Sequence, residues 1–254
     1  MKNPYDRAMP AIEIAAEKLI SFMGFPITNT LLMSWIVVIF LIILSQIISR
    51  NIRKVPAMLQ NIAEMGVESL LGMMDGVLHS RERSEKFFPF IATIFTLILV
   101  SNWFGIIPGV GSIGFFEVHN GVRNLVPLLR SSASDLNFTL TIAVLSVVLL
   151  NFYAIRELGL KVHLSKFFNF KNPVLFFVGI LELVSEFAKI VSFSFRLFGN
   201  IFAGEVLLII TGFLAPFLAP IPFLMLEIFV GFIQALVFSM LTLVFLSIAV
   251  EHEH

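Results

Sequence analysis

A few charged residues interrupt an otherwise apolar C-terminal half, and Arg196 is the most informative of them. Between Ile190 and Leu226 the chain carries one cation, Arg196, and one anion, Glu205. An arginine at mid-depth in a bilayer costs roughly 2.5–3.5 kcal/mol on insertion scales. A guanidinium does not avoid this cost by losing its proton. We therefore expect Arg196 to have a functional partner.

Helical spacing places a stripe of polar or small residues on the face of Arg196. At about 100° per residue, the following side chains fall within roughly 40° of it: Glu182, Ser185, Lys189, Ser192, Asn200 and Ala203. Glu205 falls on the opposite face, and no acid lies three or four positions from Arg196. Its countercharge must come from another segment or another chain. The small residues Gly199, Ala203 and Gly204 would let another helix approach closely.

Other polar side chains lie in the neighbouring apolar segments. Glu227 and Gln234 are seven positions apart and so share one helical face. Asn102 and Asn151 interrupt two earlier segments, where packing hydrogen bonds are a more common role than ion binding. An alternative for Arg196 is structural, because it could extend to the membrane surface or pair with Glu227 as a lock.

Composition limits the possible classes of protein. Apolar residues make up 58% of the 254 residues, which is typical of an integral membrane protein. The formal net charge is zero, so an overall basic charge offers no case for nucleic-acid binding. The absence of cysteine excludes disulfides, thiol catalysis and thiolate metal sites. The tail Glu251–His254 could bind a metal, but a frayed terminus has no scaffold, so we expect no metal site and no cofactor.

We predict one all-α membrane domain over residues 1–254. Five apolar segments are long enough to span a bilayer, which needs roughly 20 helical residues: residues 25–49, 87–107, 136–155, 174–213 and 222–250. The last two exceed that length and are expected to be tilted or to begin outside the bilayer. Apolar residues recur every three or four positions over 56–78, which predicts an amphipathic helix on the membrane surface. The glycine-rich stretch 108–121 is predicted to be a loop.

Basic residues in the connecting segments predict the orientation. They crowd two connections: Arg50, Arg53, Lys54, Arg81, Arg83 and Lys86 in the first, and Arg156, Lys161, Lys166 and Lys171 in the second. The positive-inside rule places both connections in the cytoplasm, with the N-terminus outside and the C-terminus inside. Acids precede the first apolar run, so we expect no removable signal peptide.

The motif FRLFGNIFAGE at 195–205, followed by Glu227 and Gln234, resembles subunit a of the membrane sector of F-type ATP synthases. The SDLN sequence at 134–137 agrees, and the resemblance covers essentially the whole chain. It implies a non-catalytic stator subunit with two offset half-channels that carry ions to and from a rotating c-subunit ring. H⁺ is the expected ion, with Na⁺ as the alternative. Further implied partners are b-type peripheral stalk subunits and the lipid bilayer of an energy-transducing membrane, such as the inner membrane of a bacterium.

The resemblance also implies roles for individual residues. Arg196 would face the rotor, and two sets of residues would line the half-channels: Asn200, Glu205, Glu227, Gln234 and Asn102 toward the outer side, and Glu182 and Ser185 toward the cytoplasm. Some family members have an aspartate where this chain has Gly105. Some also have a histidine in one of the two positions held here by Glu205 and Glu227.

Two other classes of protein were compared with this reading. A secondary transporter is disfavoured, because the predicted spans are odd in number and show no inverted repeat. An intramembrane hydrolase would need a Ser/His pair, paired aspartates or an HExxH motif within the spans, and the sequence has none.

Overall fold

The computed structural model describes residues 16–22, 24–111, 113–119, 122–167, 172–215 and 218–250, and this part is mostly helical. Its α-helices are α1 (Asn29–Arg50), α2 (Met58–Leu78), α3 (Arg81–Ile106), α4 (Leu136–Leu158), α5 (Leu160–Phe167), α6 (Pro173–Leu214) and α7 (Pro220–Val250). Within the described residues, α1, α3, α4 and α7 are long and apolar enough to cross a membrane. These four helices agree with the prediction of an all-α membrane protein.

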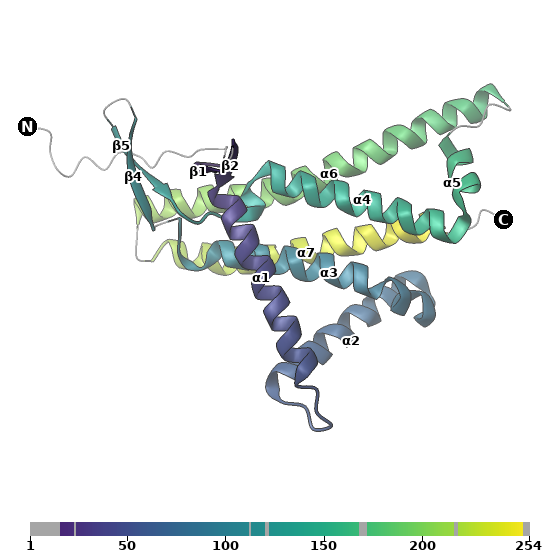
Figure 1. Ribbon diagram of the computed structural model, residues 1–254, viewed down its shortest axis with the longest axis horizontal. Helices are drawn as coiled ribbons and strands as arrows, with labels where there is room; N and C mark the ends of the chain where they lie inside the picture. The colour runs from purple at the N-terminus through teal and green to yellow at the C-terminus, as the bar shows by residue number, and fades with distance from the viewer. Residues whose placement is uncertain are drawn as a thin grey trace, which may run out of the picture.

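Four helices form the body of the molecule. Helices α3, α4, α6 and α7 run side by side along its long axis, and α1 crosses them obliquely (Figure 1). Aromatic and aliphatic side chains fill the space between them, with the rings of Phe193 and Phe238 4.7 Å apart between centroids. Many large apolar side chains of α1 and α6 instead point outward. Such an outward face suits lipid, because hydrocarbon tails solvate it without cost.

Local chemistry accounts for where several helices begin and end. The Asp135 carboxylate accepts the Asn137 backbone N–H at 2.9 Å and so caps α4. Helix α6 begins at Pro173, whose fixed φ and missing N–H suit a first turn. Helix α2 ends at His79, which adopts the left-handed conformation with φ 51°. The chain then turns directly into α3.

Short strands lie at the end of the bundle opposite the start of α3. Strands β1 (Lys18–Phe22) and β2 (Phe25–Thr28) form one antiparallel hairpin, and β4 (Gly114–His119) and β5 (Val122–Pro127) form another. Strand β3 (Pro108–Gly111) precedes the second hairpin, and a short 3₁₀-helix η1 (Ser132–Ser134) follows it. The prediction of a loop over 108–121 was therefore wrong. A Cβ at Gly114 would collide with the Val126 backbone, so glycine here allows close strand pairing rather than flexibility.

The helices of the structure begin at other residues than the predicted spans in several places. The first apolar segment becomes helical only at Asn29, because residues 25–28 pair with β1, and α3 begins earlier than predicted, at Arg81. Helix α6 has 42 residues, about 63 Å at 1.5 Å per residue, and is not among the four candidate spans. Its passage through the membrane, its tilt and the surface position of α2 therefore remain predictions.

The two ends of the bundle differ in charge. We call the end where α3 and α6 begin and α4 and α7 end the basic end, and the end near β4 and β5 the hairpin end (Figure 1). At the basic end Lys86 of α3 forms an ion pair with Glu157 of α4.

Two predictions fall on residues outside the described part of the chain. They are the absence of a signal peptide, which concerns segment 1–15, and the metal binding considered for the tail 251–254.

Candidate functional site

Arg196 lies half-buried on a face of α6 that the rest of the chain leaves open. Its guanidinium donates to the Ser192 hydroxyl at 3.3 Å, one turn earlier on the same helix. Among the described residues, the ion pairs do not include Arg196. A Cβ at Gly199 would meet no atom within 4 Å, and Ala203 is exposed. The described residues thus show no ion pair between Arg196 and Glu227, and the face of Arg196 leaves room for another helix.

Glu205 points away from Arg196, as the helical spacing predicted, and contacts Arg130. The Arg130 Nε donates to the Glu205 Oε1 at 3.0 Å, with further contacts to Oε2 at 3.4 Å. Arg130 comes from the segment between β5 and η1, and only 6% of its surface is exposed. Sequence reasoning did not single out this residue. Its position shortly before the SDLN motif was the one available signal.

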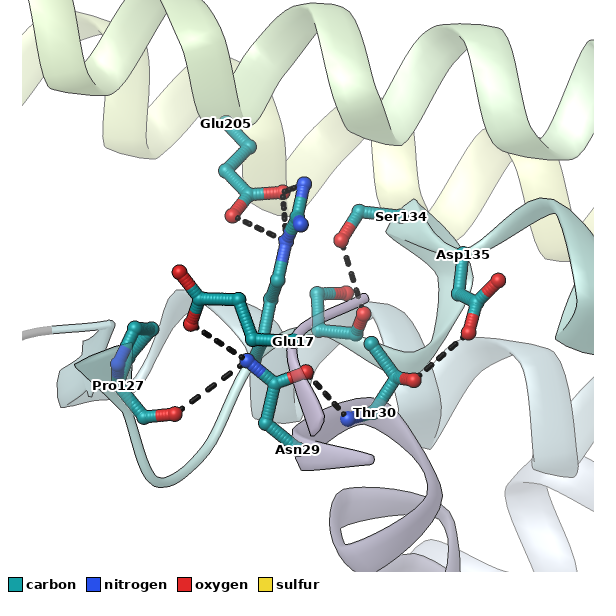
Figure 2. Close-up of polar contacts among 9 residues, drawn as sticks. Glu17, Asn29, Thr30, Pro127, Ser134, Asp135 and Glu205 are labelled. Carbon is teal, nitrogen blue, oxygen red and sulfur yellow. Dashed lines mark hydrogen bonds and ion pairs between the residues drawn. The ribbon is translucent and has the colours of Figure 1, made fainter. Parts of the chain in front are cut away.

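A network of hydrogen bonds holds the segment of Arg130 in place at the hairpin end. The Thr30 hydroxyl donates to the Asp135 carboxylate at 2.7 Å, and the Asn29 amide donates to the Pro127 carbonyl at 3.3 Å. Figure 2 shows Glu205 reaching from α6 toward this cluster. The network joins the start of α1 to the segment before α4, so the position of Arg130 depends on contacts between two separate parts of the chain.

Gly105 explains the departure from the pattern of some family members. A Cβ at this position would lie 2.6 Å from both the Cβ and the Oγ of Ser131. An aspartate would therefore need the segment around Ser131 to move. The buried Ser131 hydroxyl has no hydrogen-bond partner within the described part of the chain. Glycine at position 105 therefore lets the Ser131 segment lie directly against α3.

Glycines bring α7 close to two other helices. Glu227 is 7% exposed, and its carboxyl lies directly against Gly204 of α6, where a Cβ would overlap it. Gly231, one turn further along α7, faces Asn102 of α3, and a Cβ there would lie 3.1 Å from the asparagine Cβ. These close approaches place the Glu227 carboxyl between α6 and α7.

Amide side chains lie near Glu227 along α7. The Asn200 side chain donates to the Gln234 Oε1 at 2.7 Å, and the Asn102 side chain donates to the Gly231 carbonyl at 3.0 Å. Glu227 and Gln234 are both buried, which confirms that they share a face. The buried Gln234 Nε2 and Asn102 Oδ1 lack partners within the described residues. Asn102 therefore makes the expected packing hydrogen bond and still offers a free acceptor.

The residues predicted on the other side of Arg196 only partly come together. Glu182 lines a small cavity at the basic end, whereas Ser185 is exposed and does not line it. Next to Glu182, the Lys189 ammonium donates to Glu186 at 2.5 Å, and Asn151 donates to the same carboxylate at 3.2 Å. Asn151 thus makes a packing contact as well. His163 of α5 also lines this cavity, a residue that sequence reasoning did not consider.

Two polar clusters therefore lie at different heights along α6, with Arg196 between them. Glu186 and Glu205 are 19 positions apart by their numbering, or about 28 Å along a helix. In the described part of the chain, no group of three or more His, Asp or Glu residues could hold a metal ion. Carboxyl groups in such clusters are chemically able to accept and donate protons.

Comparison with known proteins decides the family. A family model described as ATP synthase A chain matches residues 31–247. This chain belongs to the ATP synthase A chain family. A sodium-ion-specific ATP synthase subunit a from Propionigenium modestum is 33% identical over 247 residues, covering 96% of this chain and 81% of the relative. Subunit a from Campylobacter concisus is 35% identical over 225 residues, covering 86% and 89%. Subunit a from Moorella thermoacetica is 31% identical over 222 residues, covering 87% and 90%.

Membership of the ATP synthase A chain family agrees with the resemblance seen in the sequence. The match covers residues 31–247, which include Glu182, Glu205, Glu227 and the whole of α6 with Arg196. It identifies a multi-pass membrane protein of the ion-translocating sector rather than a secondary transporter or a hydrolase. Arg196, which has no carboxylate partner among the described residues, lies within the range that the family model matches.

Proposed function

We propose that this chain is the stator ion-channel subunit of an F-type ATP synthase and that Arg196 acts on the rotor. One observation carries the proposal: Arg196 has no carboxylate partner among the described residues and lies on an open, small-residue face of α6. A permanent cation in apolar surroundings needs a countercharge. The carboxylates of a rotating c-subunit ring are the partners that this face fits.

The open face allows a rotor helix to approach Arg196 closely. A rotor carboxyl in hydrocarbon is stable when it carries a proton, because an unpaired buried charge is costly. Opposite Arg196 it can exist as the carboxylate, since the guanidinium supplies the opposite charge. Gly199 and Ala203 have no side chain or a small one beside the arginine, so the backbone of a rotor helix can come into contact with the backbone of α6. Arg196 thus promotes release of the ion and prevents ions from bypassing the rotor.

The outer half-channel follows the face of α7 that carries Glu227 and Gln234. Glu227 and Glu205 are the titratable members, and Asn102, Asn200 and Gln234 offer amide groups along the same line. Arg130 holds Glu205 as its ion-pair partner, so an arriving proton is passed chiefly by Glu227. The inner half-channel begins at Glu182, with Ser185 on the adjacent exposed face. The two paths end on either side of Arg196.

The orientation follows from the basic residues. The basic end would face the cytoplasm and the hairpin end the outer side of an energy-transducing membrane, such as a bacterial inner membrane. In this arrangement the c-ring contacts α6 and b-type stalk subunits hold the chain against rotation. Protons are the proposed ion, and a sodium-ion-specific relative makes Na⁺ the alternative to measure.

Substitution of Arg196 tests the proposal in vesicles that hold the assembled complex. Arg196→Ala should abolish ATP-driven proton uptake, while passive proton leak through the membrane sector persists or increases. Arg196→Lys should also fail substantially, because an ammonium is more compact and more strongly hydrated than a guanidinium. Parallel assays with Na⁺ added or removed identify the ion. ATP-driven pumping at the wild-type rate in Arg196→Ala would refute the rotary role.

A further inference from the structure

A small cavity opens at the basic end, where four helices meet. Its volume is about 60 Å³, room for a small number of water molecules. Helices α4, α5, α6 and α7 each contribute to its lining: Asn151 from α4, His163, Lys166 and Phe167 from α5, Glu182, Glu186 and Lys189 from α6, and Phe245, Ile248 and Ala249 from α7. One of these lining residues, Glu182, is the residue that the proposed function places in the inner half-channel.

His163 is the unusual member of this cavity. It is 6% exposed, and its Nδ1 has no hydrogen-bond partner within the described residues. Its ring packs edge-on against Phe167 at 5.4 Å between centroids. A buried histidine that serves only packing normally has its ring nitrogens paired. Here Nδ1 lacks a partner within the described residues, and the histidine lines a cavity large enough for water.

The charges that face His163 come from two elements. Lys166 lies on its own helix, and Glu182, Glu186 and Lys189 lie on α6. The lining from α4 is the uncharged Asn151, and the lining from α7 is apolar. Because Glu186 and Lys189 already pair, their charges largely offset each other near the ring. Burial lowers the pKa of His163 below its usual value, so the imidazole is neutral near pH 7 and able to accept a proton.

We propose that His163 exchanges protons between the cytoplasm and the Glu182 side of the inner half-channel. This inference rests on the proposed function and names a residue for it. During pumping, the unprotonated ring nitrogen of the neutral imidazole takes a proton from a hydronium ion that reaches the cavity, forming an N–H bond and leaving a water molecule. The imidazolium then returns that proton through water to the Glu182 carboxylate. No electrons move, and the imidazole is regenerated in each cycle.

A pair of histidine variants tests this role. His163→Asn keeps a polar side chain of similar reach but does not titrate. The matched control is His79→Asn. His79 is exposed at the basic end of the bundle, just before α3 begins, and asparagine tolerates its left-handed backbone conformation. Both are measured in inverted vesicles holding the whole complex, in weakly buffered medium. We record ATP-driven proton uptake and passive proton conductance against external pH, and confirm assembly by co-purification of the c-ring.

We expect a several-fold loss of both rates in His163→Asn that deepens as the pH rises above about 7, where free protons are scarce. Added imidazole buffer should restore most of the rate in this variant and change the wild type little. The His79→Asn control should match the wild type throughout. A wild-type rate and pH profile in His163→Asn, or a loss that imidazole does not relieve, would overturn the inference.

Two further outcomes separate the possible failures. If His163→Asn does not assemble, His163→Gln replaces it, and failure of both to assemble would show that the ring is needed for packing, which overturns the inference. If the wild-type complex itself shows no ATP-driven ion uptake, the proposed function is at fault rather than His163. Normal wild-type pumping with an unaffected His163→Asn variant refutes this inference alone.

Discussion

Gly204→Ala is the sharpest perturbation that the structure offers, because one methyl group would meet the buried Glu227 carboxyl. The new Cβ overlaps that carboxyl, which is 7% exposed and cannot move freely into water. Overpacking of this kind costs about 1–3 kcal/mol, partly offset by the roughly 0.5–1 kcal/mol that alanine gains over glycine within a helix. Displacement of a transferring group by about 1 Å can slow a reaction about a hundredfold. We therefore expect ATP-driven pumping to fall between about tenfold and a hundredfold.

Gly212→Ala is the matched control, since it lies on the same helix and its Cβ would meet no atom within 4 Å. This variant should pump normally and gain about 0.5–1 kcal/mol of stability. Proton uptake in vesicles measures the rate, and thermal unfolding of the purified complex measures stability. If Gly204→Ala pumps as fast as Gly212→Ala, the placement of Glu227 against α6 does not matter for transport, and the reasoning fails.

The remaining predictions concern the ion pair at the hairpin end and the topology. Arg130→Gln should destabilise the complex by somewhat less than the 3–5 kcal/mol typical of breaking a fully buried pair, because the Glu205 side chain is 26% exposed. Adding Glu205→Gln should recover most of that loss in thermal unfolding, and additive losses would contradict the pairing. Cysteines at the exposed Val55 and Ile113 should react with impermeant reagents from opposite sides of the membrane. Labelling of both from one side would exclude the proposed orientation.

Sequence reasoning worked best where the evidence was local. Composition and apolar segment lengths predicted the membrane helices, because a helix must present about 20 apolar residues to cross a bilayer. Helical periodicity placed Glu205 opposite Arg196 and showed that the arginine lacks an acidic partner on its own helix. Both points depend only on the fixed rotation per residue, so they hold whatever the helix packs against.

The strands at the hairpin end show where local signals misled. Glycines at 108–121 indicated a loop, yet Gly114 allows β4 to lie against β5 without a side chain between them. The same residue type favours both structures, and only the paired strand distinguishes them. Ser132 of η1 provides another example, since this residue between two predicted spans is fully buried and accepts a hydrogen bond from the Ser34 hydroxyl.

By itself the sequence determined four apolar helices long enough to cross a membrane, the family, and the lack of an acidic partner for Arg196 on its own helix. Tertiary structure decided the partners: Arg130 meets Glu205 from 75 positions away, and Gly204 makes room for Glu227 on the next helix. His163 joins the inner cavity only because four helices converge there. Periodicity describes the direction of a side chain within its own helix. It contains no information on which helix or loop lies opposite, because that depends on how all the elements pack together.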